Sequence, residues 1–203
     1  MRPILAAILC TFLLAAGLAF PAAAAEPFQF AGIPWGSNSA TVIAKMKAAG
    51  FVFKPSKKGD PTFGTDDLHF VGVLTHIKAG AFAYFDKGKL GKIMITMLPA
   101  DADALRTYQD MRTTLVTKYD EPKADDTVAV IGLPYVNGDG HEEQAIRAGK
   151  GHFLTTWSRD MGGAKTSDLT VRIPTNLAVL IEYEGPEFAA ASKQRQARGT
   201  ENL

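Results

Sequence analysis

The balance between helical and extended patterns constrains the fold of this chain more than any other feature. Two amphipathic helical patterns, one ending at Gly50 and one ending near Tyr119, stand among a larger number of strand patterns. A parallel sheet needs a covering helix at nearly every crossover, and two helices are too few for that. The sequence therefore predicts an α+β fold in which two main helices pack on a mostly antiparallel sheet.

The first helix follows a tight turn at residues 32–39, whose sequence is GIPWGSNS. Gly36 permits a sharp turn, and Ser37 or Ser39 is expected to cap the helix by accepting a hydrogen bond from a first-turn N–H. Gly50 supplies the left-handed residue that ends it. Trp35 has two interpretations, an exposed binding aromatic or a plug between helix and sheet; we expect the plug, because large aromatics dominate core burial.

The second helix is predicted from Asp101 or Asp103 to Tyr119, because apolar residues recur there at steps of three and four. Pro122 disfavours its continuation. Six side chains of the two helices are expected to be buried: Val42, Ile43, Met46, Leu105, Met111 and Leu115.

Extended patterns alternate with these helices along the chain. We expect strands at residues 51–53, 68–74, 81–85, 90–98, 127–131, 153–157, 169–173 and 177–183. A hairpin turn is expected at residues 86–89 and a glycine-rich loop at 160–167. The resulting order of helix, strands, helix, strands raises the alternative of a degenerate tandem repeat with halves 26–99 and 100–188.

The amino end has the pattern of a cleaved signal peptide at residues 1–25. Arg2 is its basic residue, an apolar run follows at 4–20, and small residues at 22–25 precede Glu26. Cys10 lies inside the apolar run after Leu9, and a lipoprotein signal would need its cysteine at the end of that run. We therefore expect an unlipidated periplasmic or secreted protein, with one domain at 26–188 and a polar tail at 189–203.

Composition excludes several classes of function for the remaining chain. Cys10 is the only cysteine, so after cleavage no disulfide, thiol nucleophile or thiolate metal site is available. The 22 basic and 21 acidic residues become balanced once Arg2 is removed. This balance argues against nucleic acid and against an anionic membrane surface as partners.

No catalytic motif is present, and we identify no catalytic residue, cofactor site or metal site. The chain lacks the Gly-x-Ser-x-Gly elbow of serine hydrolases and a phosphate-binding glycine loop. His141 and the two glutamates after it do not form the His-Glu-x-x-His zinc motif. A calcium loop starting at Asn137 would place His141 and Glu142 at its fifth and sixth positions, where an oxygen ligand and glycine are required.

The longest irregular stretch, residues 132–151, is the candidate site. It combines Tyr135, Asp139, His141 and Arg147, and functional side chains are often carried on loops held between rigid elements. These residues would line a recognition surface for a protein or a small polar ligand. The structural alternative is that Gly138 and Gly140 shape a turn, Asp139 caps a short helix at 142–147, and Ile146 anchors it.

Two segments carry a resemblance to known proteins. Pro34-Trp35-Gly36-Ser37 before a helix, and Gly138-Asp139-Gly140-His141 leading to residues 145–150, resemble segments of exported bacterial α+β domains. The layout of a helix over an antiparallel sheet is similar to the outer-membrane-assembly lipoprotein BamE and to the β-lactamase-inhibitor protein. The resemblance implies this fold and protein binding, and it implies no catalytic residue.

Two functions remain from the sequence. The first is a non-catalytic binding module that acts on a periplasmic or envelope protein, which a broad apolar surface patch would favour. The second is a small periplasmic hydrolase or ligand-binding protein that uses residues 132–151, which a cleft holding Asp139, His141 and Arg147 would favour.

Overall fold

The computed structural model describes residues 25–55, 66–126, 138 and 140–188 of the 203-residue chain. The helical elements are α1 (Ser39–Ala48), the short η1 turn (Asp101–Asp103), α2 (Ala104–Tyr119) and α3 (Glu142–Arg147). The strands are β1 (Val52–Lys54), β2 (Leu68–Leu74), β3 (Ile77–Asp86), β4 (Lys89–Met97), β5 (Ala124–Asp126), β6 (Phe153–Gly162), β7 (Lys165–Ile173) and β8 (Val179–Glu184). The predicted strand at 127–131 lies outside the described residues.

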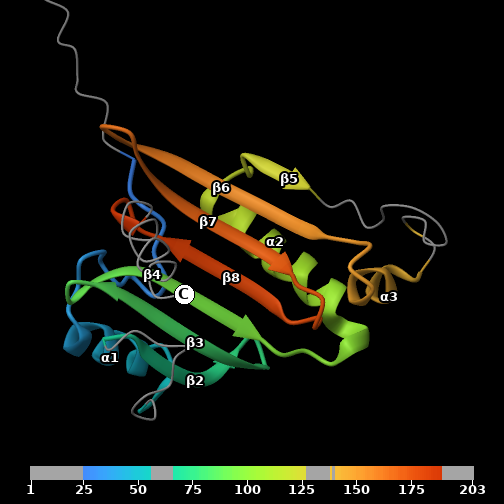
Figure 1. Ribbon diagram of the computed structural model, residues 1–203, viewed down its shortest axis with the longest axis horizontal. Helices are drawn as coiled ribbons and strands as arrows, with labels where there is room; N and C mark the ends of the chain where they lie inside the picture. The colour runs from blue at the N-terminus through green and yellow to red at the C-terminus, as the bar shows by residue number, and fades with distance from the viewer. Residues whose placement is uncertain (1–24, 56–65, 127–137, 139, 189–203) are drawn as a thin grey trace, which may run out of the picture.

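The described strands form one eight-stranded sheet in the order β1-β2-β3-β4-β8-β7-β6-β5. Every neighbouring pair is antiparallel, so the predicted α+β class with an antiparallel sheet is confirmed. The first four strands follow one another across half of the sheet. The chain then passes through α2 to the far edge at β5 and returns inward, so that β8 lies beside β4 (Figure 1).

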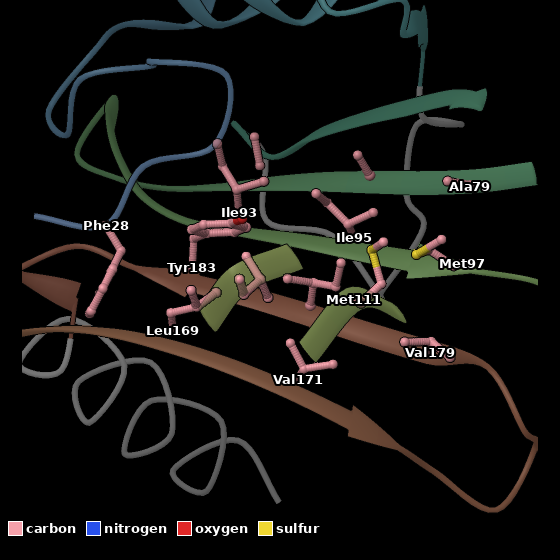
Figure 2. Packing of buried hydrophobic residues seen from close by; sticks show 14 of the residues in the cluster. Phe28, Ala79, Ile93, Ile95, Met97, Met111, Leu169, Val171, Val179 and Tyr183 are labelled. Carbon is pink, nitrogen blue, oxygen red and sulfur yellow. The ribbon is translucent and has the colours of Figure 1, made fainter. Parts of the chain in front are cut away.

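All the described α-helices pack on the same face of this sheet. One continuous core cluster contains Val42 of α1, Met111 of α2 and Ile146 of α3. Alternate strand residues complete it, among them Ile95 of β4 and Val171 of β7, and Figure 2 shows their side chains converging between sheet and helix. Burying apolar surface contributes about 25 cal/mol per Å² to stability, so this cluster is the main source of folding free energy.

The N-cap of helix α1 lies one residue away from each of the two predicted caps. Asn38, not Ser37 or Ser39, is the N-cap, and its Oδ1 accepts a hydrogen bond from Thr41 N at 2.9 Å. Asparagine is as good a cap as serine, and Ser37 instead donates its hydroxyl to Pro34 O at 2.7 Å. Gly50 ends the helix at φ +85°, as predicted.

Four of the six helical side chains expected in the core are buried, namely Val42, Met46, Met111 and Leu115. Ile43 and Leu105 are only partly buried, and they pack against the edge of the cluster. The apolar stripe of each helix is therefore narrower than the sequence suggests, because a helix lying on a sheet buries its central line fully and its flanks partly.

The predicted loop at 160–167 is wrong: β6 and β7 extend through most of it and form a hairpin. Asp160 caps the turn by accepting a hydrogen bond from Gly162 N at 2.7 Å. Gly162 and Gly163 both have positive φ, which tight hairpin turns require. Ser167 is fully buried in β7. The small polar residues at 165–167 therefore belong to a paired strand and not to a loop.

The segment before Trp35 lies along the core and is hydrogen-bonded to β7 and α2. Phe28 N donates to Ser167 Oγ of β7 at 3.0 Å, while the Trp35 indole N–H donates to Phe28 O at 2.9 Å. Tyr119 of α2 donates its hydroxyl to Gln29 O at 3.0 Å. Trp35 is only partly buried, so it packs against the core without being the enclosed plug that was predicted.

Candidate functional site

The sheet face opposite the described helices, which we call the open face, is the candidate surface. Side chains that alternate with the core residues point to it, and no described helix packs there. The strand register aligns them in rows across the sheet. The row through β2, β3, β4 and β8 consists of His69, Phe82, Met94 and Glu182.

The half of the open face on β1–β4 carries a group of apolar side chains, flanked by Lys54 and Lys78. The rings of His69 and Phe82 stack with centroids 4.6 Å apart and an angle of 8° between planes. Met94 pairs directly with Phe82 across the ladder. Val52 and Val73, on the same face, remain 59% and 57% exposed. Solvated faces of antiparallel sheets are usually polar, so this group of apolar side chains is unusual.

The centre of the open face carries a chain of ion pairs. Lys92 Nζ of β4 lies 2.7 Å from Glu182 Oε1 and 2.8 Å from Glu184 Oε1, both of β8. Arg172 Nε of β7 lies 3.0 Å from the other carboxylate oxygen of Glu182. The side chains of Lys92 and Glu182 are only 16% and 15% exposed, so each charge depends on its partners more than on water.

These contacts shift the protonation equilibria of the network. Burial alone would raise the pKa of Glu182, but hydrogen bonds and charge interactions with Lys92 and Arg172 outweigh it and lower the pKa. Burial alone would lower the pKa of Lys92, but hydrogen bonds and charge interactions with Glu182 and Glu184 outweigh it and raise the pKa. Both groups therefore stay charged at neutral pH, and the network holds three strands in register without exposing much net charge.

A histidine at the apolar end of the row behaves differently. Burial and, secondarily, the charge of Lys54 on the neighbouring strand lower the pKa of His69. The imidazole is therefore neutral at pH 7, and it stacks on Phe82 as an uncharged ring. The open face thus combines an apolar and aromatic group, flanked by Lys54 and Lys78, with an internally paired charged centre.

The residues predicted from the irregular stretch are only partly described. Tyr135 and Asp139 lie outside the described residues. His141 occupies the exposed position before α3, and Arg147 at the end of α3 forms an ion pair with Asp101 of η1. The recognition surface at 132–151 therefore stays a prediction.

The structural role expected for this stretch is visible where the chain is described. Gly138 and Gly140 have φ values of +84° and +83°, which fit the predicted turn. Ile146 is fully buried, so it anchors α3 as predicted. His141 and Arg147 line neither the cavity beside Trp35 nor the smaller one beside Asn38.

Other kinds of site find no support in the described part of the chain. Among those residues, no group of three or more histidine, cysteine or carboxylate side chains is placed to hold a metal ion. No helix within the same residues has the length and apolar character that a membrane span needs. Comparison with known proteins finds no matching family model, no matching curated protein and no matching solved structure.

Sequence patterns alone did not reveal the open-face residues. Phe82 and Glu182 alternate with the core residues of their strands. This two-residue alternation was the one sequence signal that could have placed them on the face opposite the core. What the sequence does not contain is the register that brings them into one row with His69 and Met94.

Proposed function

We propose that this protein is a non-catalytic binding module that takes a protein partner on its open face. The observation that carries the proposal is the apolar group around Phe82 and Met94, left uncovered by every described helix while the same helices bury the other face. Exposed apolar groups rimmed by polar side chains are typical of protein interaction sites. The strands that carry it are hydrogen-bonded to neighbours on both sides, which favours binding with little loss of conformational entropy.

The chemistry of the open face indicates what the partner presents. Its contact centre would be apolar or aromatic, because it must cover the Phe82–Met94 group and the exposed Val73. Its rim would be polar, because the Lys92–Glu182–Arg172 chain already satisfies its own charges and offers only its remaining hydrogen-bonding positions.

Export supports the same function and is part of the proposal. A signal-peptide pattern at 1–25 would deliver the protein to the periplasm, and the residues that follow it, Glu26 and Phe28, are hydrogen-bonded to β6 and β7. The partner would then be a periplasmic or envelope protein.

Site-specific crosslinking would test the open face. A photoreactive residue at position 94 should crosslink to a protein in periplasmic extract, and one at exposed position 113 on α2 should not. The double variant Val73→Lys with Met94→Lys should reduce capture of that protein about tenfold, since charges in an apolar contact centre are strongly unfavourable. Gln109→Lys with Thr113→Lys, two exposed positions of α2, is the matched control.

A third bait separates the open face from the loop hypothesis. Asp139→Ala with His141→Ala should capture the partner as well as the unmodified protein does. If this bait loses the partner while the open-face lysine variant keeps it, the proposal is wrong and residues 132–151 form the interface.

We also infer that the two halves are a degenerate repeat. A helix precedes four strands in each half, and the sheet order reads the same from both edges, with β4 beside β8 at the centre. The insertion of α3 between β5 and β6 and the greater length of α2 are the departures from this symmetry. A repeat of this kind would explain how two small meanders come to share one continuous open face.

A further inference from the structure

A cavity of about 600 Å³ lies at one end of the sheet, at the tip of the β3–β4 hairpin. Trp35, Leu90 and Phe188 form apolar walls, and Lys87 and Lys89 stand at its rim. Pockets that hold small ligands are commonly about 300–1,000 Å³, mostly apolar, with a few polar groups that orient the ligand. The cavity fits that description and involves none of the apolar residues of the open face.

Two aromatic walls of the cavity pack directly on the backbone at glycines. A Cβ added at Gly185 would lie 2.6 Å from Trp35 Cδ2, so the indole packs directly on the backbone there. A Cβ at Gly91 would likewise lie 2.8 Å from Phe188 Cδ2. The Trp35 indole N–H is also hydrogen-bonded to Phe28 O. The indole ring is therefore preorganised, and a part of it stays accessible.

The rim carries an excess of positive charge. Among the described residues, neither the ammonium of Lys87 nor that of Lys89 has an ion-pair partner, and both side chains are exposed. Asp86 and Glu187 also line the cavity, but Glu187 is paired with Lys165. Two lysines therefore face one uncommitted carboxylate, so the rim favours an anionic group over a cationic one.

We propose that this cavity binds a planar apolar group that carries a carboxylate. The ring would pack against Trp35, and the carboxylate would lie at the hairpin tip against Lys87 and Lys89. A free aromatic acid and the carboxyl-terminal residue of a peptide share this chemistry. The inference does not depend on the open face, so either proposal can fail alone.

Tryptophan fluorescence gives a direct test, because Trp35 and Trp157 are the two tryptophans of the chain. Trp157 is only 2% exposed and does not line the cavity. N-acetyl-phenylalanine would be titrated into the purified protein and into Trp35→Phe, and the difference would report on Trp35. We expect a saturable change that is absent from Trp35→Phe.

Charge variants test the role of the rim. Lys87→Gln with Lys89→Gln should raise the apparent Kd about threefold to tenfold, the effect expected for losing charge-assisted contacts to a carboxylate. Lys45→Gln with Lys47→Gln, two exposed lysines on α1, is the matched control and should leave it unchanged. The uncharged probe N-acetyl-phenylalanine amide should bind the unmodified protein more weakly by the same factor.

A tetrapeptide ending in phenylalanine distinguishes the two sources of the ligand. Tighter binding than N-acetyl-phenylalanine assigns the cavity to a peptide carboxyl terminus, and weaker binding assigns it to a free aromatic acid. The proposal is overturned if no titration saturates, if the amide binds as well as the acid, or if the Lys87 and Lys89 variant keeps the original Kd while its circular dichroism is unchanged.

Discussion

Single residues decide how closely backbone and aromatic rings approach in this protein. A Cβ added at Gly185 would lie only 2.6 Å from the Trp35 ring. A Cβ added at Gly80, in the middle of β3, would have no heavy atom closer than 3.8 Å. Neither glycine has a positive φ, so both could be replaced by alanine without backbone strain. The pair therefore separates the effect of a close contact from the effect of glycine itself.

We expect Gly185→Ala to lower the free energy of unfolding by about 1–3 kcal/mol, the usual range for forcing an extra methyl group into packed surroundings. Gly80→Ala should change it by less than about 0.5 kcal/mol or stabilise slightly, since alanine loses less backbone entropy than glycine. Chemical denaturation of both variants measures the difference. Equal effects would mean that the indole moves aside at little cost.

The histidine on the open face makes stability depend on pH. Because burial and Lys54 lower the pKa of His69 in the folded protein, the unfolded chain binds this proton more readily. Stability from this group is complete above the ordinary pKa of 6.5 and is lost as pH falls from there towards the lower folded value. His69→Gln should therefore lose less stability than the unmodified protein when pH is lowered below 6.5.

Titration of His69 by NMR would test the cause. Lys54→Gln should raise the pKa of His69, and Lys118→Gln, on helix α2 at the other side of the sheet, should leave it in place. A His69 pKa that both variants leave unchanged would assign the whole shift to burial.

At the scale of elements, each helix is held by a narrow line of buried side chains. Leu115 of α2 is 5% exposed and belongs to the core cluster, while Gln109 of the same helix is exposed. The helix contributes to stability through that line far more than through its own propensity.

Leu115→Ala should therefore cost about 2–5 kcal/mol, as truncations of buried leucines do. Gln109→Ala should be neutral or slightly stabilising, because alanine has the higher helix propensity. Thermal or urea denaturation would compare the two variants. A cost below about 0.5 kcal/mol for Leu115→Ala, a value typical of surface positions, would place the stripe at the surface.

Elements were predictable from the sequence where the hydrophobic pattern agreed with the turn or capping residues at its ends. Strand β2 has the predicted bounds because its apolar run is clear, and α2 ends at Tyr119 as predicted. Strand β3 instead begins at Ile77, before the predicted residue 81, because its first residues are shaped by pairing with β2. The candidate site was less predictable, since the row joining His69, Phe82 and Met94 exists only through register, which local patterns leave undetermined.

At the scale of the whole molecule, the segment after residue 25 is part of the fold. Arg159 Nη1 donates to Glu26 O at 2.7 Å, and its guanidinium lies 4.4 Å from the Phe28 ring centroid. Residues 26–28 are thus tied to the β6–β7 hairpin.

We expect the exported product to begin near Glu26. Amino-terminal sequencing of protein from a periplasmic fraction checks this, with cleavage anywhere between residues 22 and 26 fitting the expectation. A product that keeps Met1 and sediments with membranes would contradict both the leader and the proposed location.

The position of β8 governs when this protein can fold. The strand described last in the chain lies at the centre of the sheet, hydrogen-bonded to β4 on one side and β7 on the other. Until the ribosome has made it, both neighbours keep an unpaired edge, and such edges are prone to aggregate. The sheet therefore cannot be completed until nearly all of the described chain has been synthesised. A variant that lacks β8 would have unpaired edges at β4 and β7, so we expect it to aggregate and not to form a smaller stable protein.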